Sequence, residues 1–431
     1  MLRVLVVGVF VVLGVVVNAQ EVSAHAALLA STPSYAATVP EAPAVATFTF
    51  DNAVEPGLMR VKLTDLNDVE VGESEYLGES MLPTTQLKFS LPEHLDGEYL
   101  VAWTSFALDG HIVSGTIPYT VGGAAAVASA PDVPPTEAAQ QAGVTTGQNS
   151  GVPGEIVEIQ IRFISYLALS VLIGALVIVV LARTVAQTEA VQLIASQAQT
   201  AIVPAAVVAS VAALARFALI VWRLDKVDAT DQIVPLVVNG QLAVWLFAGL
   251  GAAGAGLLAR KRSLAALALA GVAAAAVPAG GHAAVYPAPG IGTLFASAHL
   301  VAACVWAGSV GVFAYATTSE VWPTLSQRWA EVRELLKRLS GWFAVSFVVL
   351  GVTGARAAYV YTDASPQGRY GSVLWLKVAA VGVVAAIGGL NAFLRRSGRP
   401  LKVALLLGEA FVFIAVMILA AVLATTSPNI F

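Results

Sequence analysis

The segment GEYLVAWTSFALDGHIVSGTIPYTV, residues 97–121, decides the fold of the first part of the chain. Two runs rich in β-branched and aromatic residues, 98–103 and 115–121, lie on either side of the turn signal Asp109-Gly110. Runs of this kind, bounded by turn residues, are typical of β-strands. Further runs of the same kind lie at 44–50, 60–64 and 86–90. The pattern predicts a small antiparallel β-sandwich over residues 25–121.

Large apolar side chains on these runs are the expected core of the sandwich. They are Phe48, Phe50, Leu63, Phe89, Tyr99 and Trp103. The composition changes after the last run, because residues 122–155 are rich in Ala, Pro, Gly, Thr and Gln. Such a segment cannot bury a core, so we expect a flexible linker there.

The N-terminus has the features of a secretory signal peptide. Arg3 precedes an apolar run, residues 4–17, that is shorter than the roughly 20 residues of a membrane span. Val22-Ser23-Ala24 then fits a cleavage site, which predicts a signal peptide over 1–24 and a mature chain that begins at His25. An uncleaved anchor, or cleavage after Ala19, is the alternative.

Most of the remaining chain is apolar. The 431 residues have a mean hydropathy of +0.79, and 12% are charged, against about 25% in soluble proteins. Eight apolar stretches predict an all-α domain of eight transmembrane helices within residues 156–431. They lie near 161–182, 201–222, 237–259, 264–280, 291–315, 340–361, 371–394 and 401–424.

Charge supports this topology, because cytoplasmic loops carry an excess of Lys and Arg. With the linker outside, the loops expected inside carry twelve basic residues and those expected outside carry three. We therefore expect a multi-pass protein of the cytoplasmic (plasma) membrane with its β-sandwich outside the cytoplasm. The segment 320–338 looks like an amphipathic helix lying at the inner face.

Other features exclude whole classes of function. The formal net charge of −4, without a long basic run, gives no sign of a nucleic-acid partner. Cys304 is the single cysteine, so an internal disulfide and a two-cysteine metal site are excluded. The sequence contains no Gly-x-x-x-x-Gly-Lys loop, so any transport must be passive or coupled to an ion gradient.

Cleavage before His25 would create a metal-binding group. The free amine and the imidazole of one residue can chelate one ion, and imidazole suits copper. Asp109 and His111 are two residues apart, so on an extended segment their side chains point to one side. Together these groups predict a nitrogen-rich Cu(II) site. For His111 the alternative is an ordinary surface turn.

Four segments then resemble the CopC family of periplasmic copper proteins: residues 25–33, 44–52, 97–103 and 108–115. The resemblance implies a cupredoxin-like β-sandwich whose Cu(II) ligands are His25, Asp109 and His111. Some members add a glutamate after the phenylalanine of the first long strand. This chain has Phe50-Asp51-Asn52 there, so a part for Asn52 or Asp51 stays open. His94 matches no ligand position, and we expect it in a solvated turn.

The apolar part resembles the CopD family, which occurs fused behind CopC in YcnJ-like copper resistance and uptake proteins. The segments that carry this resemblance are 299–308, 338–343, 351–354 and 370–377, together with Asn391. Ionisable residues in a membrane are costly and usually functional or paired. His282 and His299 are therefore candidates for a membrane copper path, with hydrogen bonding between helices as the alternative. For Cys304 we expect packing, and for Glu409 an ion pair with Arg356.

These observations predict a copper-binding membrane protein and not an enzyme. The sandwich would capture Cu(II) outside the membrane and pass it to the helices for transport, with import as the expected direction. Its partners would be the copper ion, the lipid bilayer, an extracytoplasmic copper donor or a cytoplasmic copper chaperone. Membrane-anchored sequestration or sensing without transport is the main alternative. A copper oxygenase and a haem-binding redox protein are weaker ones.

Overall fold

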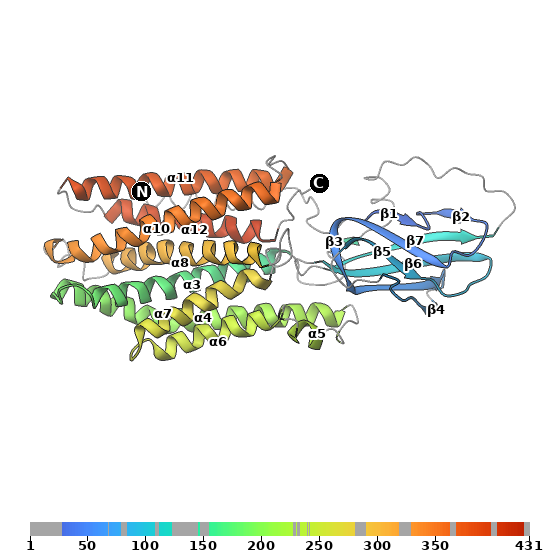
Figure 1. Cartoon of the computed structure of the whole chain (residues 1–431), viewed down its shortest axis with the longest axis horizontal. Coiled ribbons are helices and arrows are strands. Elements are labelled where there is room, and N and C mark those ends of the chain that lie inside the picture. The colour runs from blue at the N-terminus through green and yellow to red at the C-terminus, as the bar shows by residue number, and fades with distance from the viewer. Residues whose placement is uncertain are drawn as a thin grey trace. The chain divides into compact units, whose positions relative to one another are not determined.

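The computed structural model describes residues 28–67, 69–78, 84–107, 112–122, 145–146, 155–226, 230, 233–238, 240, 242–280, 290–318, 329–362, 368–397 and 403–425. These residues divide into two compact units, one built around β-strands and one around helices (Figure 1). The two units correspond to the predicted sandwich and the predicted apolar domain. The predicted signal peptide lies outside the described residues.

The first unit is an antiparallel β-sandwich, as predicted. Its strands are β1 (Leu28–Thr32), β2 (Ala37–Val39), β3 (Val45–Asp65), β4 (Glu70–Glu73), β5 (Thr84–Ser90), β6 (Gly97–Ala107), β7 (Ile112–Val121) and β8 (Thr145–Thr146). They pair in the order β1-β3-β6-β7-β2, with β4 and β5 on β3 and β8 on β7. β2 is the exception to the antiparallel pattern, because it runs parallel to β7. β8 lies within the predicted linker and pairs with β7.

Strand β3 organises the sandwich because it is 21 residues long and changes partners along its length. Its first part, from Val45 to Phe50, lies between β1 and β5. Its last part, from Met59 to Asp65, pairs with β6 and β4. The sequence predicted two separate strands here, 44–50 and 60–64, and the structure joins them into one.

The core of the sandwich matches the predicted one. Phe48, Phe50, Leu63 and Trp103 are at most 2% exposed, and Phe89 is 3% exposed. The rings of Phe50 and Trp103 meet edge to face with centroids 5.3 Å apart. Fully burying an apolar side chain of this size contributes about 1.5–3 kcal/mol, so this cluster is a main source of the unit's stability. Tyr99 is partly buried against the same cluster.

The second unit is all-α. Its helices are α3 (Glu155–Ala182), α4 (Glu189–Lys226), α5 (Ile233–Val238), α6 (Ala243–Leu258), α7 (Ser263–Ala276) with the 3-10 helix η2 (Val277–Gly280), α8 (Ile291–Thr318), α10 (Trp329–Thr362), α11 (Gly368–Arg396) and α12 (Val403–Leu423). Among the described residues, seven helical segments are long and apolar enough to cross a membrane, and α6 is a shorter apolar helix. Each of the eight predicted stretches therefore corresponds to a helix.

The shortest of the eight apolar segments is α6, with 16 residues, and α7 together with η2 spans 18 residues. One expectation about these helices was wrong. Residues 329–338 do not form a separate helix at the membrane surface, because α10 runs without a break from Trp329 to Thr362. The rest of the segment predicted as that surface helix, residues 319–328, lies outside the described residues.

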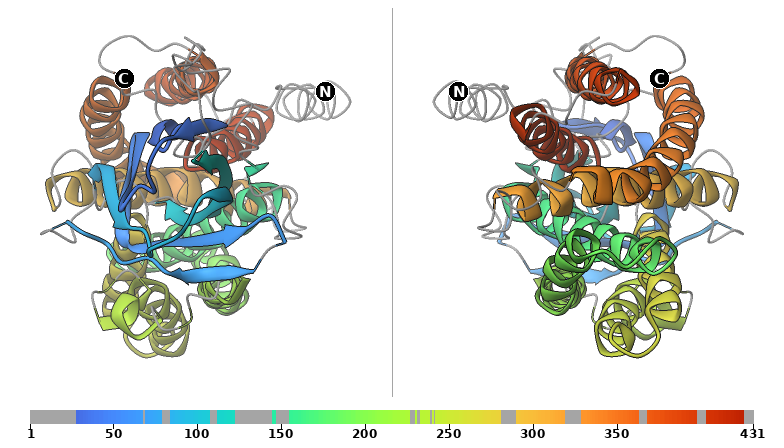
Figure 2. Two further views of the ribbon diagram at one scale, coloured as in Figure 1. Left: turned by 90° about the vertical axis from the view of Figure 1, so that its right-hand side faces the viewer. Right: turned by 90° about the vertical axis from the view of Figure 1, so that its left-hand side faces the viewer.

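Helices α3 and α8 run side by side through the middle of this unit. In Figures 1 and 2, α10, α11 and α12 lie on one side of this pair and α4, α6 and α7 on the other. Small residues allow the close approach: a Cβ added at Gly308 would collide with the carbonyl oxygen of Ser170. Gly174 faces the backbone of Gly308 in the same way. Small residues at four-residue spacing are typical of tightly packed membrane helices.

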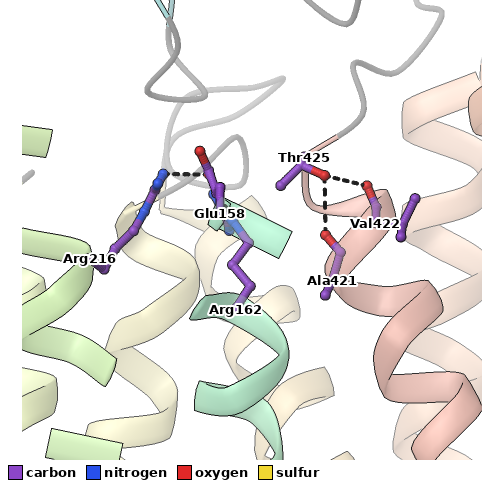
Figure 3. Close-up of polar contacts among 6 residues, drawn as sticks. All are labelled: Glu158, Arg162, Arg216, Ala421, Val422 and Thr425. Carbon is purple, nitrogen blue, oxygen red and sulfur yellow. Dashed lines mark hydrogen bonds and ion pairs between the residues drawn. The ribbon is translucent and has the colours of Figure 1, made fainter. Parts of the chain in front are cut away.

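A buried group of charges joins α3 to α4 (Figure 3). The Glu158 carboxylate, fully buried, accepts hydrogen bonds from Arg162 Nη2 at 2.8 Å and Nε at 3.0 Å. Arg216 Nη2 lies 2.7 Å from the same oxygen, and its guanidinium stacks on the Trp245 ring of α6. The carboxylate thus holds two helices together and offsets the charge of arginines that apolar surroundings could not accommodate alone.

The described part of the chain ends just after α12. Thr425 Oγ1 donates hydrogen bonds to the carbonyl oxygens of Ala421 and Val422, at 3.4 and 2.9 Å (Figure 3). Carbonyl groups in the last turn of a helix have no partner within the helix. Here the Thr425 amide also donates to Val422, at 3.0 Å, and the single proton of its hydroxyl is shared between the two carbonyl groups.

Candidate metal centre

The beginning of β1 and the end of β6 lie on the same edge of β3. At Val54, β3 has Thr84 of β5 as partner on one side and Ala107 of β6 on the other. At residues 47–49 its partners are again β5 on one side and β1 on the other, and the β1 pairing continues with Leu28 opposite Phe50. The first residue of β1 and the last residue of β6 therefore lie on the same edge of β3, separated by its residues 51–53.

This arrangement positions the segments that precede β1 and follow β6. β6 and β7 remain paired up to Phe106 and Ile112, so residues 108–111 connect two strands that are already joined. His25, Asp109 and His111 themselves lie outside the described residues, as do the side chains of Asp51 and Asn52. What the structure describes is the pair of strands that the predicted ligands precede and follow in the chain.

The scaffold is well packed below this edge. Trp103 is 1% exposed, and a Cβ added at Gly115 of β7 would lie 2.9 Å from its indole nitrogen. Gly115 therefore leaves the space that the indole fills. Met59 and Ser105 are paired across β3 and β6 beside it, and both are buried. The strands that lead to residues 108–111 are held by this packing.

His94 differs from the expectation of a solvated turn. Its Nδ1 lies 2.7 Å from the carbonyl oxygen of Pro92, and its Nε2 lies 2.7 Å from the Tyr119 hydroxyl. A carbonyl oxygen only accepts, so Nδ1 carries the proton and Nε2 accepts from Tyr119. The pKa of Tyr119 is raised, first by burial and then by the charge of Tyr99, so its hydroxyl stays a donor. Both ring nitrogens of His94 are therefore engaged in hydrogen bonds within the sandwich.

In the helical unit, His299 of α8 has a defined tautomer. Its Nδ1 lies 2.8 Å from the Thr353 hydroxyl of α10, which is 2.6 Å from the carbonyl oxygen of Val349. The hydroxyl has one proton and donates it to that carbonyl, so it accepts from Nδ1–H of His299. The Nε2 lone pair of His299 is then the one available to a metal ion, which is the arrangement expected of a ligating histidine.

Comparisons with known proteins agree with the predicted nature of the sandwich. Residues 28–122 match the family model described as the CopC domain. This part of the chain is a CopC domain. A stretch of 102 residues is 31% identical to the copper transport protein CutJ of Bacillus subtilis (strain 168), and it covers 23% of this chain and 18% of that relative. The crystal structure of CopC from Methylosinus trichosporium OB3b is 25% identical, with a TM-score of 0.21, and the match covers 24% of this chain and 99% of that one.

The matched CopC domain begins at the first described strand and ends just after β7. The helical unit lies outside that match. Of the two histidines predicted for it, His282 lies outside the described residues and His299 has the geometry given above. Within the described parts of the chain, no three His, Cys, Asp or Glu side chains gather in a way that could hold a metal ion.

The other predicted residues of the helical unit have different partners. Cys304 packs as expected: it is fully buried and lies 3.5 Å from the Ser170 hydroxyl. The expected ion pair of Glu409 with Arg356 is wrong, because Arg356 stacks on Phe295 at 4.5 Å and Glu409 lies beside Asn391. Glu158, the partner of Arg216, was missed because the first span was expected to begin at 161.

Proposed function

We propose that the CopC domain captures Cu(II) outside the cytoplasmic membrane through His25, Asp109 and His111, and that the helical unit then transports copper, in the import direction. The capture of Cu(II) by the CopC domain rests on one observation: the first residue of β1 and the last residue of β6 lie on the same edge of β3. The second half rests on the apolar helices, the resemblance to CopD and the geometry of His299.

Chain lengths support a single site for the three ligands. Phe50 and Val54, the partners of Leu28 and Ala107, are at most about 13 Å apart at roughly 3.3 Å per residue. Three residues of extended chain reach about 10 Å, and two reach about 7 Å. His25 is three residues before Leu28, and Asp109 is two after Ala107. Both can therefore reach one ion above residues 51–53 of β3.

The chemistry of the three residues supports Cu(II) as the ion. An amine, two imidazoles and a carboxylate form a donor set of nitrogen and oxygen, which favours tetragonal Cu(II). This capture needs a free amine, so it depends on cleavage between Ala24 and His25. Asp51 and Asn52, at the middle of the same edge, are candidates to hold the outer ligands in place.

Delivery to the helices is the second step. A tether between two modules raises the local concentration of the captured ion at the receiving site. His299, with its Nε2 lone pair available, is our candidate receiver, and His282 is a second one. No nucleotide-binding loop occurs in the sequence, so the energy would come from the ion's own gradient or from another ion.

Two measurements test this proposal. Edman degradation of the secreted full-length protein gives the mature terminus, and a copper titration of the same sample gives affinity and stoichiometry. We expect His25 as the first residue and one Cu(II) per chain, lost in His111→Ala and retained in His94→Gln. A different first residue, or equal binding by His111→Ala, would contradict capture at this site.

Transport is tested separately in cells. We expect copper accumulation to rise on expression of the wild type and to stay at background with His299→Ala. Ser297→Ala, on the same helix, is the matched control, because it loses only a hydrogen bond to the Ala275 carbonyl. Normal Cu(II) binding with no effect on accumulation would favour sequestration at the membrane, which also fits a family match confined to the CopC domain.

A further inference from the structure

Glu409 of α12 is a carboxyl group buried among apolar helices. It is 4% exposed, and its Oε2 lies 3.4 Å from Asn391 Nδ2 of α11. Trp306 of α8 donates a second hydrogen bond to it. A Cβ added at Gly388 would lie 3.2 Å from its Oε1, so the glycine leaves the space that this oxygen needs. We call these four residues the Glu409 pocket.

The Glu409 pocket contains no positive charge. Both donors are neutral, and within the described residues no Lys, Arg or His forms an ion pair with Glu409. The described titratable groups on the helices packed against α12 are Lys377, Tyr370 and Arg396 on α11, His299, Cys304 and Tyr315 on α8, and Glu158, Arg162 and Tyr166 on α3. None of these forms a hydrogen bond or an ion pair with Glu409.

A comparison with Glu158 indicates the protonation state of Glu409. Glu158 is buried as completely but lies against two arginines, so its charge is compensated. An ionised Glu409 would be an uncompensated charge in apolar surroundings, which is strongly unfavourable. The stable form of Glu409 at rest is therefore the protonated one.

Asn391 is suited to both forms of the carboxyl group. It is 8% exposed, and its Oδ1 is buried without a hydrogen-bond partner. Its amide nitrogen can donate to an ionised carboxylate. Turning the amide exchanges the places of its nitrogen and oxygen, and Oδ1 then accepts from a protonated carboxyl. One side chain can thus serve as donor in one state and acceptor in the other.

We propose that Glu409 is a proton-binding site of the helical unit, and that its release and uptake of a proton are coupled to the passage of the metal ion. When a cation approaches, the O–H bond of Glu409 breaks, and the proton passes to water. The carboxylate then offsets the charge of the cation until the ion leaves and a proton from water restores the O–H bond. The coupling rests on the proposed transport function, whereas the proton site does not.

Infrared spectroscopy of the full-length protein in detergent tests the site itself. At neutral pH we expect an absorption band of a protonated carboxyl that is absent in Glu409→Gln and retained in Glu334→Gln, an exposed carboxylate of α10. Asn391→Ala should shift this band without removing it, because it removes a hydrogen-bond partner. A spectrum that is the same in wild type and Glu409→Gln would overturn the proposal.

Proteoliposomes with an enclosed pH-sensitive dye test the coupling. With the wild type, we expect copper added outside to change the internal pH as it enters, and with Glu409→Gln this change should fall to the level of protein-free liposomes. Copper entry with the same pH change in both proteins would refute the coupling. If the wild type moves no copper at all, the transport proposal fails, and the infrared band still decides whether Glu409 binds a proton.

Discussion

Thr353 accepts a hydrogen bond from Nδ1 of His299, at 2.8 Å, because its own proton is donated to Val349. One hydroxyl of α10 thereby fixes the tautomer of a histidine on α8. A partner of this kind orients a ligating histidine, and its loss typically costs 10- to 100-fold in metal affinity or activity.

Thr353→Val keeps the shape of the side chain and removes the acceptor. We expect copper transport by this variant to fall about 10- to 100-fold, while Cu(II) binding by the CopC domain is unchanged. Copper uptake into proteoliposomes measures the first and a copper titration the second. Thr362→Val is the matched control, since that hydroxyl makes the same kind of backbone hydrogen bond on α10, to Ala358. Equal copper uptake by Thr353→Val and Thr362→Val would contradict a role of Thr353 in positioning His299.

The close contact of Gly115 with Trp103 predicts a strong effect on stability. Gly115→Ala introduces a methyl group 2.9 Å from the buried indole nitrogen, so strand or ring must shift. Overpacking of this kind costs about 1–3 kcal/mol of unfolding free energy. Urea unfolding of the full-length protein, followed by tryptophan fluorescence, measures it. Gly57→Ala, where a Cβ meets no atom within 4 Å, should be nearly neutral.

The buried ion pairs of Glu158 with Arg162 and Arg216 predict a second strong effect on stability. Glu158→Gln leaves Arg162 and Arg216 without their carboxylate, and breaking a buried ion pair costs about 3–5 kcal/mol. We expect a lower melting temperature of the protein in detergent. Glu334→Gln removes only exposed ion pairs at the start of α10, which contribute about 0–1 kcal/mol. Similar melting temperatures for the two variants would show that the buried pair contributes little.

The turn from β3 to β4 predicts a pH effect. The Val69 amide lowers the pKa of Asp65, and the Asn67 side chain and amide lower it further. A carboxyl group whose pKa is lowered on folding stabilises the fold above its unfolded pKa, near 3.9, and loses that contribution as the pH falls through its folded pKa. Asp65→Asn should therefore be less stable than the wild type at pH 7, and the difference should vanish in acid. Urea unfolding at several pH values checks this, and a constant difference would contradict it.

Much of the fold could be predicted from the sequence because it follows local periodicity. Alternating apolar residues gave the core around Phe48 and Trp103, and the length of the apolar stretches gave the helices. The joining of β3 could not be predicted, since Asp51-Asn52 and Pro56-Gly57 look like strand breaks. The continuity of α10 was missed for a related reason: the charged residues 331–338 favoured a surface helix.

The polar contacts of buried side chains in both units were less predictable, because they join distant parts of the chain. Tyr119 is 25 residues from His94, and Arg216 is 58 residues from Glu158, so no local pattern pairs them. The unpaired state of Glu409 likewise became visible only when its neighbours on α8 and α11 were known. The assignment of His25, Asp109 and His111 as copper ligands stays a prediction.

The position of β1 and β6 on one edge of β3 has a consequence for the proposed binding and release of the metal ion. The described ladder of strands and the aromatic core are complete without any of the three predicted ligands, which precede β1 or follow β6 in the chain. Under the proposed function, loading and unloading the ion there leaves the interior of the sandwich unchanged. The proposed carrier can then hand over its metal without losing its own architecture.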